Sequence, residues 1–107
     1  MPSKSTDLMR FRAKIFNALS DPIRLDIIDF LRDGEKCVCE ITPRLKLHQP
    51  VVSRHLKILK NAGLVKRRKK GTWHMYSITN PEVYDVIDQL TPELLAVLKQ
   101  RIIEQIA

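Results

Sequence analysis

Two cysteines, separated by a single residue, are the most chemically distinctive feature of this sequence. Cys37 and Cys39 are the only cysteines among 107 residues, which is too few for the disulfide framework of a small secreted domain. We therefore interpret them as intracellular thiols. Such thiols pack as small apolar groups, bind a metal ion or respond to oxidants, and the sequence leaves these three roles open.

The spacing restricts how the two thiols could hold one ion. Side chains at i and i+2 of an α-helix point about 200° apart, whereas in an extended segment both project from the same side. A shared ion therefore requires that this turn be unwound or lie outside the helix. Thiolates select soft ions, and Glu40 is expected to be a first-turn helix residue rather than a ligand. A disulfide here closes a small strained ring, so a redox switch is the weaker alternative.

Positive charge is concentrated in one quarter of the chain. The formal net charge is +7, and the segment 44–70 holds ten cations and no acidic residue. Cations without intervening acids repel one another, and a polyanion relieves that repulsion. A solvated surface is the alternative, but the pattern favours a face that binds nucleic acid. The ten cations are Arg44, Lys46, Arg54, Lys57, Lys60, Lys66, Arg67, Arg68, Lys69 and Lys70.

Length and composition exclude several other classes. A chain of 107 residues that is 44% hydrophobic is expected to form one folded domain over residues 1–107. Its longest apolar run, 94–98, is too short to span a membrane, and residues 1–14 lack a signal-peptide core, so we expect a cytoplasmic protein. The three histidines form no paired-ligand motif and no glycine-rich phosphate loop is present, so we expect no enzyme.

The pattern of apolar and turn residues predicts a mainly α-helical fold with a small β-hairpin. Helices are expected over about 7–19, from Pro22 to a stop at Gly34, and from Pro50 to about Ala62. A short helix before the last of these should begin at about Cys39 or later, because Pro43 lacks an N–H. Strands over 64–68 and 73–78 should be joined by residues 69–72. Proline starts at positions 81 and 92 indicate two C-terminal helices, or one with a break.

This order of elements predicts a winged helix-turn-helix, with the helix-turn-helix over about 38–62 and the wing over about 64–78. In the helix from residue 50, the side chains near its start are expected to contact base edges, and those further along to contact phosphate. His55 projects into the apolar side and is expected to be a hydrogen-bonded structural residue. The proposed base readers are Ser53 and Arg54, with Gln49 as an adenine reader, and the proposed phosphate contacts are Lys57 and Lys60.

The wing carries cations that suit the DNA backbone or the minor groove, namely Arg67, Lys69 and Lys70, together with Trp73 and His74. Trp73 alone indicates little, because a hairpin tryptophan is more often packed than stacked on a base. At the other end of the chain, 13 of the 24 residues from 83 to 106 are apolar, more than one buried face requires. The helices over about 7–19 and 81–106 are therefore predicted to form a two-fold dimer.

Several strings of residues resemble the ArsR/SmtB family of metal-responsive repressors over residues 8–90. They are Leu19-Ser20-Asp21-Pro22-Ile23-Arg24-Leu25, Cys37-Val38-Cys39-Glu40-Ile41, Gln49-Pro50-Val51-Val52-Ser53-Arg54-His55-Leu56-Lys57-Ile58-Leu59, Ala62-Gly63-Leu64-Val65, and Arg68-Lys69-Lys70-Gly71-Thr72-Trp73-His74-Met75-Tyr76. The resemblance implies a homodimer that binds double-stranded operator DNA without a cofactor and leaves it when an inducer binds.

The resemblance also identifies which inducer sites this chain lacks. The arsenical branch has a third cysteine three residues after the second, where this chain has Thr42. Residues 1–16 contain no cysteine, which excludes the branch of the family that adds N-terminal cysteines. The zinc site of the last helix is absent, because Ile87 stands in place of its histidine. What is left is the pair Cys37 and Cys39 as a site for arsenite, antimonite or another thiophilic ion, with a structural or redox-sensing pair as the alternative.

Overall fold

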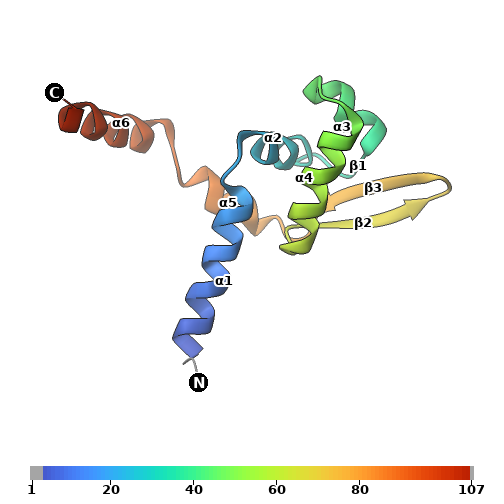
Figure 1. Ribbon diagram of the computed structural model, residues 1–107, viewed down its shortest axis with the longest axis horizontal. Helices are drawn as coiled ribbons and strands as arrows, with labels where there is room; N and C mark the ends of the chain where they lie inside the picture. Colours follow the sequence, from blue (N-terminus) through green and yellow to red (C-terminus); the bar gives the residue numbers. More distant parts are fainter. Residues whose placement is uncertain (1–3, 107) are drawn as a thin grey trace.

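The computed structural model describes residues 4–106, so the two ends of the predicted domain lie outside it. A body of short helices and a small sheet carries two helices that extend away from it (Figure 1). The helices are α1 (Lys4–Leu19), α2 (Pro22–Phe30), α3 (Val38–Leu45), α4 (Gln49–Asn61), α5 (Glu82–Asp88) and α6 (Pro92–Ile106). The strands are β1 (Lys36–Cys37), β2 (Val65–Lys70) and β3 (Trp73–Ile78).

The starts of α2 and α6 follow the predicted signals. The carboxylate of Asp21 accepts hydrogen bonds from the backbone N–H groups of Ile23 and Arg24, and proline opens α2. The Thr91 hydroxyl accepts the N–H of Leu94 in the same manner at α6. The C-terminal segment therefore forms two helices rather than one helix with a break. Helix α1 begins at Lys4, three residues before the predicted start.

The sheet has the order β1-β3-β2 within the described residues, and both pairings are antiparallel. The turn between β2 and β3 consists of Gly71 and Thr72 alone, with Gly71 at a φ of 62°. The prediction of a four-residue connection was therefore wrong, because Lys69 and Lys70 pair with His74 and Trp73 as part of the ladder. Strand β1 was not predicted, since two residues are too short to show an alternation.

The core lies where α2, α3 and α4 pack on one another and on the start of the hairpin. Its fully buried side chains come from all three helices, and Tyr84 of α5 joins them with its hydroxyl donating to the Ile28 carbonyl at 2.7 Å. This core holds the helix-turn-helix rigidly against the wing. The largest fully buried side chains are Ile27, Ile28, Leu31, Ile41, Val52, Leu56 and Leu59.

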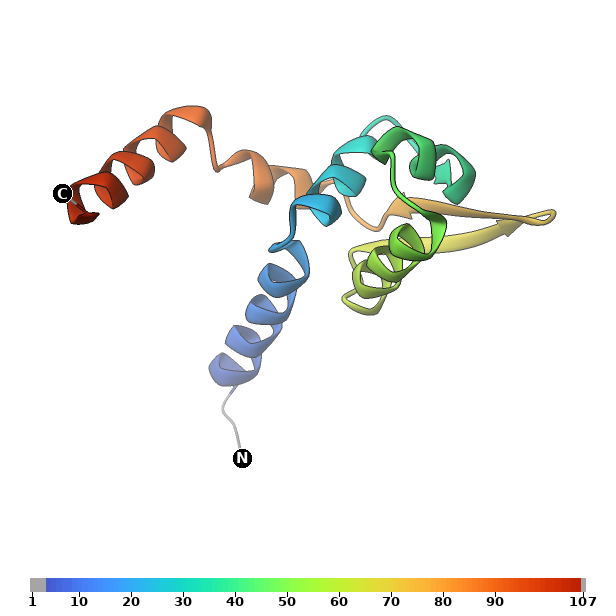
Figure 2. The same ribbon diagram turned by 45° about the horizontal axis from the view of Figure 1, so that its top comes forward.

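Helices α1 and α6 extend as two arms from this body, and both views show their free ends pointing away from it (Figures 1 and 2). The radius of gyration is 16.4 Å, whereas a compact domain of this length would have about 13 Å. The C-terminal part of α1 packs into the core through Ala18 and Leu19, with Ile15 packed against it. No side chain of α6 is buried within residues 92–106.

Candidate nucleic-acid interface and thiol pair

Helix α4 presents the predicted polar face to solvent. Ser53, Arg54, Lys57 and Lys60 are all exposed, and in residues 4–106 none of them makes a side-chain hydrogen bond or ion pair. The helix begins at Gln49, one residue earlier than predicted, with Pro50 in its first turn. Ile58 differs from its apolar neighbours Leu56 and Leu59, because it is 37% exposed whereas they are fully buried.

His55 is a structural residue, as its position on the apolar side predicts. It is 7% exposed, and its Nδ1 lies 3.1 Å from Nη1 of Arg24. A guanidinium only donates, so Nδ1 accepts and the ring carries its proton on Nε2. Arg24 also donates to the carbonyls of Ala18 at 2.6 Å and Asn17 at 3.4 Å. One arginine therefore joins the end of α1 to the helix that carries the polar face.

The cations of the wing differ in whether an acid neutralises them. Arg68 binds the carboxylate of Glu35 through two nitrogens, and this hydrogen bond raises the pKa of Arg68 and lowers the pKa of Glu35. Arg67, Lys69 and Lys70 are exposed and have no such hydrogen-bonded partner in the described part of the chain. These three are the wing cations that were predicted to contact DNA. Trp73 is 55% exposed and does not pack into the core.

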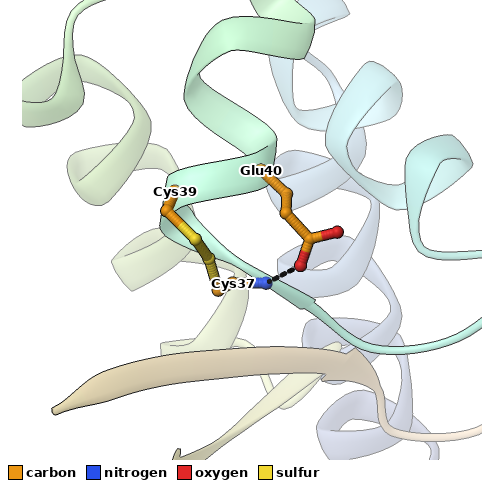
Figure 3. A group of neighbouring side chains, drawn as sticks. All are labelled: Cys37, Cys39 and Glu40. Carbon is orange, nitrogen blue, oxygen red and sulfur yellow. Dashed lines mark hydrogen bonds between the residues drawn. A yellow bond between two sulfur atoms is a disulfide. The ribbon is translucent and has the colours of Figure 1, made fainter.

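The cysteine pair lies where β1 ends and α3 begins. Cys37 caps the helix with an extended backbone, at φ −83° and ψ 160°, and its partner across the sheet is Met75 of β3. Cys39 is in the first turn of α3, and a disulfide joins the two sulfur atoms (Figure 3). Because Cys37 lies outside the helix, the sulfurs meet without unwinding α3. The spacing allowed either an unwound helical turn or a pair that lies partly outside the helix, and the structure has the second arrangement.

The start of α3 also departs from the sequence prediction. The helix begins at Val38 instead of Cys39 or later, which makes Pro43 its sixth residue. Proline has no N–H to donate to the carbonyl of Cys39. The early start is stabilised by Glu40, whose carboxylate accepts the backbone N–H of Cys37 at 3.1 Å (Figure 3).

The donor atoms around the pair suit a soft ion once the disulfide is reduced. The sulfurs of Cys37 and Cys39 and a carboxylate oxygen of Glu40 all lie within 4.8 Å of one another. Cys37 is 4% exposed, whereas Cys39 and Glu40 are exposed. Two thiolates are soft ligands, and the carboxylate is a harder one that already holds the helix cap. Thr42, at the position of the third family cysteine, donates its hydroxyl to the Val38 carbonyl at 2.8 Å.

One open groove of about 770 Å³ brings most of the predicted site residues together. It lies between the start of α3, the polar side of α4 and the wing, and it is lined by both cysteines. Arg54, Lys69 and Lys70 do not line it. The predicted site residues along it are Cys37, Cys39, Gln49, Ser53, Lys57, Lys60 and Arg67, joined by Trp73 and His74.

Sequence reasoning missed two residues that organise these surfaces. Arg24 bridges α1 and α4 from the second helix, and Glu35 neutralises Arg68 from the loop before β1. Arg24 and its partner His55, like Glu35 and its partner Arg68, are more than 30 residues apart in the sequence, so no periodic pattern connects them. A buried histidine could have indicated that a donor must exist, but could not identify it.

Comparisons with known proteins agree with this geometry. Residues 21–67 match the model of the family described as bacterial regulatory protein, arsR family. The chain is 49% identical to an uncharacterized HTH-type transcriptional regulator of Methanocaldococcus jannaschii, over 77% of this chain and 92% of the relative. It is 44% identical to an arsenical resistance operon repressor of Staphylococcus xylosus, over 70% of this chain and 71% of the relative.

A solved structure has the same architecture. The solution structure of a homodimeric winged helix-turn-helix DNA-binding domain from Mycobacterium bovis superimposes with a TM-score of 0.75 at 28% identity, covering 98% of this chain and 93% of that one. No helix within residues 4–106 is long and apolar enough to cross a membrane. Taken with the exposed polar face of α4, the cationic wing and the paired cysteines, these likenesses show that the chain belongs to the arsR family of DNA-binding transcriptional regulators, which are not enzymes.

Proposed function

We propose that this protein is a sequence-specific repressor that binds operator DNA as a homodimer and leaves it when a soft metal or metalloid ion, such as arsenite, binds Cys37 and Cys39. The observation that carries the proposal is the meeting of two sulfur atoms at the start of α3. This helix precedes α4, whose polar face is free to enter the DNA major groove.

The DNA-binding roles follow from position along α4 and the wing. Ser53 and Arg54, in the first half of α4, read base edges, and Gln49 reads adenine. Lys57 and Lys60 lie further along the same face and bind phosphate, as do the wing residues Arg67, Lys69 and Lys70. The helix-turn-helix then comprises α3 and α4, over about 38–62, and the wing comprises β2 and β3, over about 64–78.

The arms supply the dimer interface. Exposed apolar side chains line both of them, including Leu8 and Phe11 of α1 and Leu98 and Ile102 of α6. Apolar surface of this extent on a small protein marks an interface. The Mycobacterium bovis domain of the same fold is homodimeric. A two-fold axis through the arms sets two α4 helices at successive major grooves, about one DNA turn apart.

The inducer is assigned by ligand chemistry and by one relative. The Staphylococcus xylosus protein is an arsenical resistance operon repressor, and trivalent arsenic is a soft ion that thiolates bind. The pair supplies two sulfurs after a cellular thiol reduces the disulfide, with the reductant's own thiols becoming oxidised in exchange. No cofactor is needed for DNA binding in this scheme, because the residues that contact DNA belong to the protein itself.

The decisive experiment compares operator binding by the wild type and by the Cys37→Ser, Cys39→Ser double variant. Both are kept reduced with a phosphine, and a duplex is first selected by the protein from a random-sequence pool. Fluorescence anisotropy then follows release as arsenite, cadmium or zinc is added. We expect arsenite to release the wild type and leave the double variant bound. Equal behaviour of the two proteins would exclude the pair as the inducer site.

A gain-of-function variant tests the missing third sulfur. Thr42 lies one turn after Cys39 and lines the same groove, so Thr42→Cys should bind arsenite more tightly and release DNA at a lower concentration. Pro43 opposes this gain, because it biases residue 42 away from the α region. Thr42→Ser is the matched control, since it keeps the hydroxyl that donates to Val38. Sulfur-to-arsenic absorbance measures binding, and an unchanged affinity in Thr42→Cys would contradict the prediction.

The disulfide itself favours a second candidate function, a redox-sensing regulator without a metal inducer. In that case oxidation alone would change operator affinity, because it fixes the start of α3 relative to β1. The measurement is operator affinity of the oxidised and the phosphine-reduced wild type with a chelator present. A difference that disappears in the double serine variant supports the redox function, and equal affinities exclude it.

A further inference from the structure

The groove described above connects the thiol pair directly with the DNA-binding surface. Cys37 and Cys39 line one wall, Ser53 and Lys57 of α4 line a second, and the wing lines a third. The pair is therefore not behind the helix-turn-helix or at the dimer arms. Figure 3 shows both cysteine side chains on the side of β1 and α3 that faces the strands of the wing.

The charge of this groove indicates what occupies it. Lys57, Lys60 and Arg67 line it, and no aspartate or glutamate does within the described residues. None of these three cations has a hydrogen-bonded acidic partner there, whereas Arg68 on the same strand is neutralised by Glu35. Unpaired cations on two walls of an open groove favour an anion between them, and the anion that α4 and a wing meet together is a DNA phosphate backbone.

The two cysteines differ in how they face this space. Cys37 is 4% exposed and its backbone pairs with Met75 of β3, whereas Cys39 is exposed. A group attached to Cys39 therefore extends into the groove, while Cys37 anchors it to the body. The groove volume of about 770 Å³ is open to solvent along the same side, so an attached group and a phosphate backbone would require the same space.

We propose that the thiol pair forms part of the wall of the DNA-binding groove, so that a ligand on Cys39 and the DNA backbone exclude each other by direct contact. This inference rests on the proposed DNA-binding function but not on arsenite as the inducer. It differs from release through a shift of α3, because exclusion requires no movement of α4. It also gives the exposed residues Trp73 and His74, which line the same space, a place beside the bound DNA.

The first test is protection of the thiol by DNA. The phosphine-reduced Cys37→Ser variant, which keeps Cys39, is treated with iodoacetamide with and without the selected duplex, and alkylation is followed by mass spectrometry. With duplex at about 100 times Kd, roughly 1% of the protein is free, so alkylation of Cys39 should slow by up to about 100-fold. The control carries Gln89→Cys on the double serine background, with its thiol at the exposed end of α5. Its alkylation rate should be the same with and without the duplex.

The second test varies the size of the attached group. The Cys39 thiolate of the same variant attacks a methanethiosulfonate reagent, forming a mixed disulfide and releasing methanesulfinate. A methylthio group and a much larger thio-linked chain are compared. Under direct exclusion the loss of DNA affinity increases with the size of the group on Cys39. The variant Lys57→Ala, which removes one positive charge from the groove, should instead weaken DNA binding without changing the rate at which the free protein is alkylated.

The outcomes separate this inference from the proposed function. If arsenite releases the wild type from DNA but bound DNA leaves Cys39 alkylation unchanged, exclusion is overturned and the repressor function stands. If small and large groups weaken DNA binding equally, exclusion is likewise overturned, because a shift of α3 would explain the result. If the protein selects no duplex from the pool, both the function and this inference fail.

Discussion

The body and the arms of this molecule use apolar residues in opposite ways. In the body, Ile28 and Leu56 are completely buried among side chains of α2, α3 and α4. In the arms, Ile102 and Ile103 of α6 are more than half exposed. Hydrophobic side chains of one type therefore stabilise two separate equilibria in this protein. Those of the body stabilise the folded chain, and those of the arms are available to stabilise an assembly.

The largest expected effect comes from a charge placed on an arm. Ile102→Glu should abolish the dimer, because burying a carboxylate in an apolar interface is strongly unfavourable. Operator affinity should fall by roughly 10² to 10⁴-fold, since each half-site would be bound separately. Light scattering measures the mass and anisotropy the affinity. Gln105→Glu adds the same charge on the same helix as a control, and a dimer that persists in Ile102→Glu would contradict the assignment of α6.

A pair of truncations separates the two equilibria directly. Ile28→Ala leaves a cavity in the body and should lower the free energy of unfolding by about 2–5 kcal/mol at every protein concentration. Ile103→Ala removes no buried contact of the single chain, so its effect should appear only as a change in how the melting temperature depends on protein concentration. Thermal unfolding at several concentrations measures both. A concentration-independent loss in Ile103→Ala would show that α6 packs on its own chain.

Arg24 connects the two regions, and its removal should affect both. Arg24→Ala leaves the buried Nδ1 of His55 and the Ala18 carbonyl without their donor, which should cost about 1–3 kcal/mol of unfolding free energy. Chemical denaturation measures this cost. The matched control is Arg12→Ala, because Arg12 is exposed and, within residues 4–106, its side chain hydrogen-bonds to the Met9 sulfur, at 3.6 Å, rather than to the core. Equal stabilities of the two variants would contradict a bridging role.

Within the body, two classes of cation should behave differently on DNA. Arg54→Ala should weaken specific binding by about 1–3 kcal/mol and relax the sequence preference, as expected for a bidentate base contact. Lys69→Ala should weaken binding to all duplexes alike and reduce the salt slope by about 1. Salt titrations with the selected and with a scrambled duplex measure both. If the two variants lose specific and non-specific binding in the same ratio, the assignment of roles is wrong.

The smallest expected effect concerns the ion pair at the junction between body and arm. Arg32 donates two hydrogen bonds to Asp88 at the end of α5, and these lower the pKa of Asp88. A lowered pKa contributes stability that is present above the unfolded-state value and is lost as the pH falls through the folded-state value. Asp88→Asn should therefore be less stable than the wild type at pH 7, and the difference should shrink as the pH falls below the ordinary carboxyl value of about 3.9, as measured by thermal unfolding across this range. A difference that is constant with pH would contradict this linkage.

Much of the fold was predictable because its signals are local. Asp21 and Pro22 mark the start of α2, Thr91 and Pro92 mark the start of α6, and the apolar face of α4 follows from its period. The winged helix-turn-helix and the family resemblance rest on such signals. The errors occurred at element edges, where pairing across the sheet competes with turn chemistry, as for Lys69 and Lys70 in β2.

The paired cysteines and the acid-free cationic segment can be identified as the reactive groups without a structure, because residue type and spacing are written in the chain. How these groups meet depends on contacts between elements that are distant in the sequence. The extended backbone of Cys37 and its pairing with Met75 bring the two sulfurs together beside the wing. The contacts of Arg24 with His55 and of Glu35 with Arg68 join residues 31 and 33 positions apart. Such contacts depend on the packing of whole elements, which no local pattern specifies.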